Sequence, residues 1–358
     1  MRPITGSAEP SAVARVPSPR MAVLLNVNAK RVTGSLVRAL QRTIGPEAVL
    51  VSHSLEEAEA HCASVLDRRI ELLAVGGGDG SVTHALNLLE RLSQEKGVPI
   101  PTVGVLKLGT GNALGYLTGA GHVLDDIKAW MRRGFGPTRS LSLVEDMEEG
   151  FRFPFASVGY DARVLNDYEA LVGSTRHPLG RVVMRSVWGY VVAAFTRTIP
   201  TELAARPIRF KVRATGGASA IDPRTDEERP LPDGSVLFDG MARSVTLGSS
   251  PFYGYGIPAL PFARRRHDRF QVRVSTATPL QMVARFPALW RGTLRTELFQ
   301  DFLVSGVEVE LAEHLPFQMA GEAAGQRRHF HWELSKSTFQ LASGSRAPLS
   351  TGLLARAR

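Results

Sequence analysis

The residues best suited to chemistry form a glycine-rich segment with one carboxylate inside it. In ELLAVGGGDGSVT, residues 71–83, an apolar run leads into four glycines, one aspartate and two hydroxyl side chains: Gly76, Gly77, Gly78, Asp79, Gly80, Ser81 and Thr83. Because glycine has no Cβ, such a backbone can close its N–H groups around an anion. The segment therefore predicts a strand, a phosphate-binding loop and a helix start, whose N-terminus attracts negative charge.

Asp79 is the unusual member of this loop. A carboxylate among phosphate-binding groups would repel the ligand unless it holds a divalent cation, orders the loop or moves a proton. The alternative is a glycine-rich turn in which Asp79 only caps the helix.

A second segment repeats this design further along the chain. In VGVLKLGTGNALGYLTG, residues 103–119, an apolar run is followed by Gly109, Thr110, Gly111 and Asn112 and then by apolar residues at helical spacing. In an α/β sheet, the loops that follow the carboxyl ends of parallel strands lie at one edge of the sheet, where such folds bind ligands. The two loops should therefore be neighbours. Thr110 and Asn112 would offer hydroxyl and amide groups to a phosphate or ribose. The alternative is a capped helix start with Asn112 in a turn.

Alternating strand and helix patterns position both loops. Strand patterns at 22–27, 48–52, 71–75 and 102–106 alternate with helix patterns at 35–43, 55–66, 82–93 and 124–133. This alternation predicts an α/β domain with a parallel sheet. Period-two segments follow at 151–158, 207–215, 241–248, 269–276 and 307–314. They predict a larger, mainly antiparallel β domain in the C-terminal part of the chain.

The charge of the chain points to an anionic partner. Its formal net charge is +9, and the densest basic cluster is RRRHDR, residues 264–269, unless that run is only a solvated loop. Nucleic acid and anionic membranes would both attract such a chain. We expect no nucleic-acid partner, because the sequence lacks zinc-finger spacing, an RNP-like stretch and a basic helix with aromatic platforms. A basic surface would hold a membrane reversibly.

Length and apolar content indicate a two-domain cytoplasmic protein. The chain has 358 residues, of which 44% are hydrophobic, and its one cysteine, Cys62, cannot form an internal disulfide. No apolar run approaches the ~20 residues of a membrane span, and the start has no signal-peptide core. Residues 1–20, rich in Pro, Ser, Ala and Arg, are predicted to form a disordered tail.

GGGDG followed by serine, and LGTGN further along, resemble the nucleotide-binding motifs of the diacylglycerol kinase catalytic superfamily. This superfamily includes bacterial lipid kinases, sphingosine kinases and ceramide kinases, and is distantly related to NAD kinases. MAVLLNVNAKRV, ASVGYDARV and MAGEAAG resemble further family segments, so the likeness spans most of residues 21–325. It implies an NAD kinase-like nucleotide-binding α/β domain at 21–145, joined by 336–350, and a β-rich lipid-binding domain at 146–335.

The resemblance also implies roles for individual residues. ATP, the implied cosubstrate, would contact Asn26, Asn28, Ser52 and the two glycine loops. Asp161 would orient the head group of the acceptor lipid; the alternatives are that Asp167 or Glu169 does so, or that Asp161 is only a turn residue. Glu322 would take the proton from the lipid hydroxyl, with Asp79 and Mg²⁺ at the transferred phosphate.

Two departures from the family affect this site. Ala320 stands where the family carries the aspartate of Asp-Gly-Glu, so one expected carboxylate is missing. A structural Mg²⁺ would be held by the side chain of Asp268 and the carbonyls of Arg265 and Phe270, but Arg269 replaces the glycine of that turn.

Three functions therefore remain open. The leading prediction is an ATP-dependent lipid kinase, peripheral at the inner membrane face, that phosphorylates a primary hydroxyl of diacylglycerol, a sphingoid base or ceramide. The alternatives are an NAD kinase-type nucleotide kinase and a catalytically weak relative, which Ala320 suggests. Residues 181–199 are predicted to form an amphipathic helix that lines a lipid pocket, rests on the bilayer interface or belongs to the core. The sequence specifies neither the lipid nor the oligomeric state.

Overall fold

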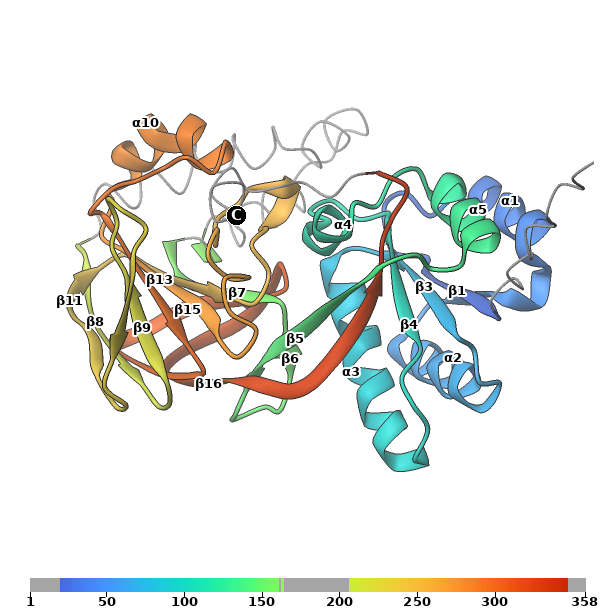
Figure 1. Ribbon diagram of the computed structural model, residues 1–358, viewed down its shortest axis with the longest axis horizontal. Helices are drawn as coiled ribbons and strands as arrows, with labels where there is room; N and C mark the ends of the chain where they lie inside the picture. Colours follow the sequence, from blue (N-terminus) through green and yellow to red (C-terminus); the bar gives the residue numbers. More distant parts are fainter. Residues whose placement is uncertain (1–19, 161, 164–205, 347–358) are drawn as a thin grey trace, which may run out of the picture.

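The computed structural model describes residues 20–160, 162–163 and 206–346 and has two lobes (Figure 1). One lobe is an α/β layer structure built from the N-terminal part of the chain. The other is built mainly from antiparallel strands. The predicted fold class is therefore confirmed. Asp161 and the predicted helix at 181–199 lie outside the described residues.

Four parallel strands form the centre of the N-terminal lobe. In space their order is β2 (Val49–Ser52), β1 (Met21–Asn26), β3 (Leu72–Gly77) and β4 (Thr102–Lys107). The strands read as nearly continuous apolar runs because helices cover both faces of the sheet. The carboxyl ends of β3 and β4 are neighbours, since Gly76 pairs with Leu106 and Gly77 with Lys107.

Two apolar clusters mark the two covered faces. One cluster joins the sheet to α2 (Leu55–Asp67), α3 (Asp79–Lys96) and α4 (Ala113–Thr118). The other joins it to α1 (Gly34–Ile44) and α5 (Val123–Arg133). A short 3₁₀ turn, η1 (Pro46–Ala48), leads into β2. Helix α2 begins at the predicted residue and α1 one residue earlier than predicted. Their starts are capped by Ser54 and Thr33, whose side chains accept the N–H groups of Glu57 and Leu36.

A long strand, β16 (Glu322–Ala342), belongs to both lobes. It pairs antiparallel with β15 (Gly306–Met319) in the second lobe and with β5 (Thr138–Asp146) between the lobes. Its last residues reach β4, where Leu341 pairs in parallel with Val103. Figure 1 shows β16 crossing from one lobe to the other, so one sheet runs through the molecule. The domain boundaries near 145 and 335 stay a proposal.

Antiparallel strands build the second lobe around its own core. They are β6 (Arg152–Phe153), β7 (Phe155–Gly159), β8 (Ile208–Ala214), β9 (Ala218–Ile221), β10 (Glu228–Leu231), β11 (Val236–Ala242), β12 (Ser244–Gly248), β13 (Phe270–Ser275), β14 (Phe299–Val304) and β15. The inward side chains form one apolar cluster that includes Phe210, Phe270, Phe330 and Trp332. A 3₁₀ turn, η3 (Gly254–Gly256), lies in the segment between β12 and β13.

One helix of the second lobe, α10 (Pro279–Trp290), does not appear in the sequence prediction. It connects β13 to β14 and lies on the outside of the lobe (Figure 1). A capping box starts it, because Thr278 and Gln281 bond each other's backbone N–H groups. Within the described ranges, no helix is long and apolar enough to cross a membrane.

Candidate active site

The two glycine loops touch through their backbones at the carboxyl ends of β3 and β4. A Cβ on Gly109 would lie 2.8 Å from the nitrogen of Gly78 and 3.0 Å from the carbonyl oxygen of Gly77. No side chain at position 109 fits between the loops, which explains Gly109, whereas a Cβ on Gly78 would make an ordinary contact at 3.8 Å. The loops are therefore neighbours, as expected from their positions after adjacent strands.

Asp79 holds the two loops together. It is the first residue of α3, is only 8% exposed, and its Oδ1 accepts the backbone N–H of Leu114 at 3.2 Å. Burial raises its pKa to about 6, although hydrogen bonds from the backbone of Ala113, Leu114 and Asn112 act in the opposite direction. The carboxylate thus caps a helix start, but that of α4 rather than of its own helix. Of the roles considered for Asp79, ordering the loop is the one that these contacts support.

Asn112 closes its own loop. Its Oδ1 accepts the N–H of Gly109 at 3.0 Å and its Nδ2 donates to the Gly109 carbonyl at 2.8 Å. The backbone of Asn112 is left-handed, with φ of 54°, a conformation that asparagine tolerates well. Both polar atoms of its amide are therefore engaged within the loop. The neighbouring Thr110 is half-buried.

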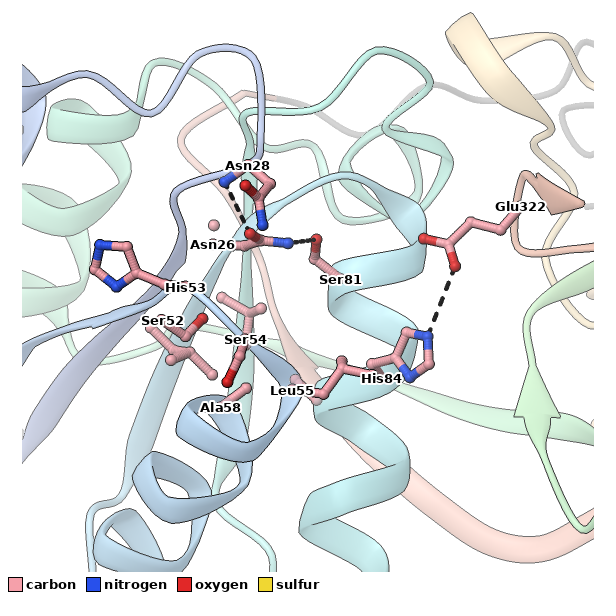
Figure 2. Close-up of a pocket in the computed structure, with 14 residues that line it drawn as sticks. Asn26, Asn28, Ser52, His53, Ser54, Leu55, Ala58, Ser81, His84 and Glu322 are labelled. Atoms are coloured by element: carbon pink, nitrogen blue, oxygen red, sulfur yellow. Dashed lines mark hydrogen bonds and ion pairs between the residues drawn. The ribbon is translucent and has the colours of Figure 1, made fainter. Parts of the chain in front are cut away.

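A pocket of about 290 Å³ opens beside the first loop (Figure 2). It lies between α2, α3, the ends of β1 to β3 and the start of β16. Its lining consists of Leu24, Asn26, Asn28, Ser52, His53, Ser54, Leu55, Ala58, Val75, Gly76, Ser81, His84, Ala85 and Glu322. The aliphatic members come mainly from strands β1 and β3 and from the helices, while the polar members come from strand ends and helix starts.

The polar side of the pocket is built around Asn26 and Ser81. The Nδ2 of Asn26 donates to the hydroxyl of Ser81 at 3.0 Å, and its Oδ1 accepts the N–H of Asn28 at 2.9 Å (Figure 2). The N-cap residue of α3 is Gly78, which has no side chain to satisfy the N–H groups of the first helical turn. These N–H groups and the helix dipole make this turn suited to an anion.

Glu322 reaches this helix start from the other lobe. It follows a tight turn between β15 and β16, in which Met319 pairs with Glu322 and both intervening residues have positive φ, 51° at Ala320 and 83° at Gly321. Its carboxylate lies against the Cα of Gly80, in the space that a Cβ there would occupy. Its Oε2 is 3.6 Å from Nε2 of His84, and the Glu322 side chain is 60% exposed (Figure 2).

The structure brings Asn26, Ser52, Gly76, Ser81 and Glu322 together at one pocket. Gly77, Gly78 and Gly80 lie beside it in the same loop, whereas Asp79, Gly109 and Asn112 shape the loops rather than line the pocket.

Sequence reasoning missed His53, Leu55, Ala58 and His84 as pocket residues. The helix starts carried a signal for some of them: His84 lies three residues after Ser81, and Ala58 three residues after Leu55, so each pair shares a helix face.

The predicted structural Mg²⁺ site has unfavourable surroundings. The carboxylate of Asp268 pairs with Arg266 at 3.2 Å and with Arg269 at 3.9 Å, and the hydrogen bond from Arg266 lowers its pKa. Arg265 donates to the carbonyl of Asp226, and Phe270 begins β13. One carboxylate already neutralised by two guanidinium groups does not fit a divalent cation. Across the described ranges, no three His, Cys, Asp or Glu side chains form a metal-binding group.

Comparisons with known proteins give a family match and structures of similar fold. Residues 20–142 match the family model of the diacylglycerol kinase catalytic domain. A solved structure of a diacylglycerol kinase from Bacillus anthracis strain Sterne is similar over 90% of this chain and 97% of its own, with 18% sequence identity and a TM-score of 0.58. Two further structures from that strain, provisionally assigned the same activity, align with the same identity and coverage and a TM-score of 0.59. No curated protein matches the sequence. At this identity, the solved structures establish the shared fold.

Proposed function

Because the chain belongs to the superfamily of the diacylglycerol kinase catalytic domain, we propose that it is an ATP-dependent lipid kinase. It transfers the terminal phosphate of ATP to a primary hydroxyl of a membrane lipid, either diacylglycerol, a sphingoid base or ceramide. It works from the cytoplasm, at the inner membrane face, as a peripheral protein.

The pocket suits a nucleotide. The aliphatic side chains of Leu55, Ala58 and Ala85 would contact the base, and the phosphates would lie at the uncapped first turn of α3. Phosphoryl transfer needs little covalent chemistry from a protein; it needs the phosphates held in place and their charge balanced. The hydroxyl of Ser81, held by Asn26, adds a hydrogen-bonding group at the same helix start.

The position of Glu322 carries the proposal. A carboxylate from the β-rich lobe lies against Gly80, at the point where the phosphates would meet an acceptor. Among the described residues that line the pocket, it is the one carboxylate. It would accept the proton of the lipid hydroxyl as the oxygen attacks phosphorus, and the nearby imidazole of His84 would help to orient it.

Mg²⁺ enters this scheme with ATP and would neutralise the phosphate charge. Among the described residues that line the pocket, Glu322 has the one carboxylate, the kind of group that fits Mg²⁺, but as the proposed base it must stay free to take the proton. Phosphate oxygens and water would therefore supply most of the ligands. Asp79 fits less well, since backbone N–H groups already engage its carboxylate.

A catalytically weak relative is the second candidate, and Ala320 favours it. The family carries a carboxylate at this position, and here the side chain is a buried methyl group, 3% exposed. An NAD kinase-type activity is the third candidate, because that family shares the glycine-aspartate loop.

A transfer assay with radiolabelled ATP and a panel of acceptors distinguishes the three candidate functions. We expect phosphate transfer to at least one of diacylglycerol, sphingosine and ceramide presented in mixed micelles, and none to NAD. Transfer to NAD alone would overturn the lipid kinase proposal. ATP binding without transfer to any acceptor would select the weak relative.

A further inference from the structure

The outward face of α10 is apolar along its whole length. Its four large apolar side chains are Leu280, Val283, Phe286 and Trp290, which are 59%, 37%, 38% and 41% exposed. These positions fall on one stripe of the helix, and Ala284 and Pro287, also exposed, lie between them. A helix on the outside of a protein normally presents polar residues to water, so this stripe marks a contact surface.

The charges around the stripe are basic. Within α10 and directly after it, the charged residues are Arg285 and Arg291, and both are basic. Farther from the helix along the chain, Arg273 and Arg295 pair with Asp301 and Asp226 and add no free charge. Arg291, exposed at the end of α10, follows Trp290 directly. Arg285 is the one charged residue within the helix, and it is half-buried. A surface with these properties is complementary to an apolar layer bordered by negative charge.

We propose that the stripe of α10 docks the protein on an anionic phospholipid bilayer. Phe286 and Trp290 lie next to each other, with ring centroids 5.6 Å apart, and such rings prefer the boundary between acyl chains and head groups. Arg291 and the net charge of +9 add attraction to anionic head groups. Among the described residues, no helix could span a membrane, so a lipid kinase would need such a surface to reach its substrate. This inference therefore rests on the proposed function.

A second copy of the chain is a poorer occupant. The helix has 12 residues, so the stripe is about 18 Å long and about 10 Å wide. This corresponds to roughly 200 Å² of flat surface, whereas a stable protein interface buries about 800 Å² on each partner. A bilayer needs no matching shape, and a short amphipathic helix is enough to bind it.

The docking helix is also connected to the glycine loops. Gly292, just after α10, packs so closely on Pro258 that a Cβ would lie 2.9 Å from its Cγ. The same segment donates the N–H of Tyr255 to the carbonyl of Gly111 at 2.8 Å. One stretch of chain therefore joins the docking helix to the second glycine loop.

Vesicle flotation with the full chain, without ATP, tests the proposal. We expect the protein to bind vesicles of phosphatidylcholine with 30% phosphatidylglycerol more strongly than vesicles of phosphatidylcholine alone. Phe286→Ser together with Trp290→Ser should lower the partition coefficient at least tenfold. Arg291→Gln should lower it about fivefold on the anionic vesicles and little on the neutral ones.

Met147→Ser is the matched control, because Met147 is 45% exposed in the turn between β5 and β6. These two strands lie away from α10 (Figure 1). It should bind vesicles like the wild type. Unchanged thermal melting of each variant, followed by circular dichroism, excludes loss of the fold as the cause of weaker binding.

Two results would overturn the proposal that α10 docks on a bilayer. One is equal vesicle binding by the wild type and the double serine variant. The other is a wild-type dimer in sedimentation that the double variant converts to a monomer while vesicle binding stays the same. A parallel assay with dispersed dioctanoylglycerol separates this failure from that of the kinase proposal. Transfer to dispersed lipid with unchanged vesicle binding rejects only the docking, and vesicle binding without transfer to any acceptor rejects only the kinase.

Discussion

At the scale of single residues, Asp79 makes the stability of the folded protein depend on pH. Its carboxylate is buried and accepts backbone hydrogen bonds at the start of α4, so it is part of the frame of the site. Burial disfavours its charged form, and the pKa of about 6 lies above the ordinary value of 3.8. Below both values the group is protonated in the folded and unfolded chains alike.

Asp79→Asn should therefore flatten the pH dependence of stability. As pH rises from about 4 to about 6, the unfolded wild type ionises first, so the folded state loses stability through this group, by roughly 3 kcal/mol for such a difference in pKa. Urea unfolding between pH 4 and pH 7 should show this loss in the wild type and not in the variant. Asp67→Asn, at an exposed residue paired with Lys96, should keep the wild-type profile. The same decline in Asp79→Asn would show that another group causes it.

Glu322 allows the sharpest test of the proposed chemistry. Glu322→Gln keeps the shape of the side chain but removes the base, so turnover should fall by roughly 10²- to 10⁴-fold while ATP affinity changes little. Steady-state transfer assays and calorimetric titration with ATP measure the two effects. Glu313→Gln, at an exposed glutamate on β15 outside the pocket, should leave both unchanged. Unaltered turnover in Glu322→Gln would remove Glu322 from the mechanism.

At the scale of elements, the turn between β15 and β16 sets the position of Glu322. Two central residues with positive φ give the twist that a two-residue hairpin prefers, and asparagine, aspartate or glycine usually occupies the first of them. Ala320 occupies it here at φ of 51°, which costs roughly 1–2 kcal/mol relative to a right-handed backbone. The carboxylate that this chain lacks would thus also have favoured the turn.

Ala320→Val should destabilise the protein by roughly 2 kcal/mol, because β-branched residues rarely adopt a left-handed backbone. Ala320→Gly should stay within about 1 kcal/mol of the wild type, since glycine accepts this φ without strain. The free energy of unfolding in urea measures both. Ala323→Val, at an exposed residue of β16 that pairs with Gln318, is the control and should change stability by less than about 0.5 kcal/mol. Equal losses in Ala320→Gly and Ala320→Val would rule out backbone strain as the cause.

At the scale of the whole molecule, the sequence predicted what depends on local pattern. Apolar runs followed by glycine loops were enough for β3, β4, the following helices and the fold class. Contacts between segments that are far apart in the chain could not be predicted from local sequence pattern. His84 meets Glu322 because β16 returns from the other lobe, and the partner of Asp79 is a backbone N–H of α4. Helix α10 was missed because Pro287 lies inside it and its exposed face is apolar, which hides the usual helical pattern.

The path of β16 decides which parts of the chain can exist alone. A fragment that ends at residue 142 would contain the matched catalytic domain but would leave the outer edge of β4 without its neighbour, Leu341 of β16. An unpaired, apolar parallel strand is a template for association with other chains. Such a fragment is therefore expected to aggregate when expressed, and co-expression with the remainder of the chain should restore material that elutes as a defined species in gel filtration. The β-rich lobe can thus be exchanged only together with the strand that pairs with β4 of the other lobe.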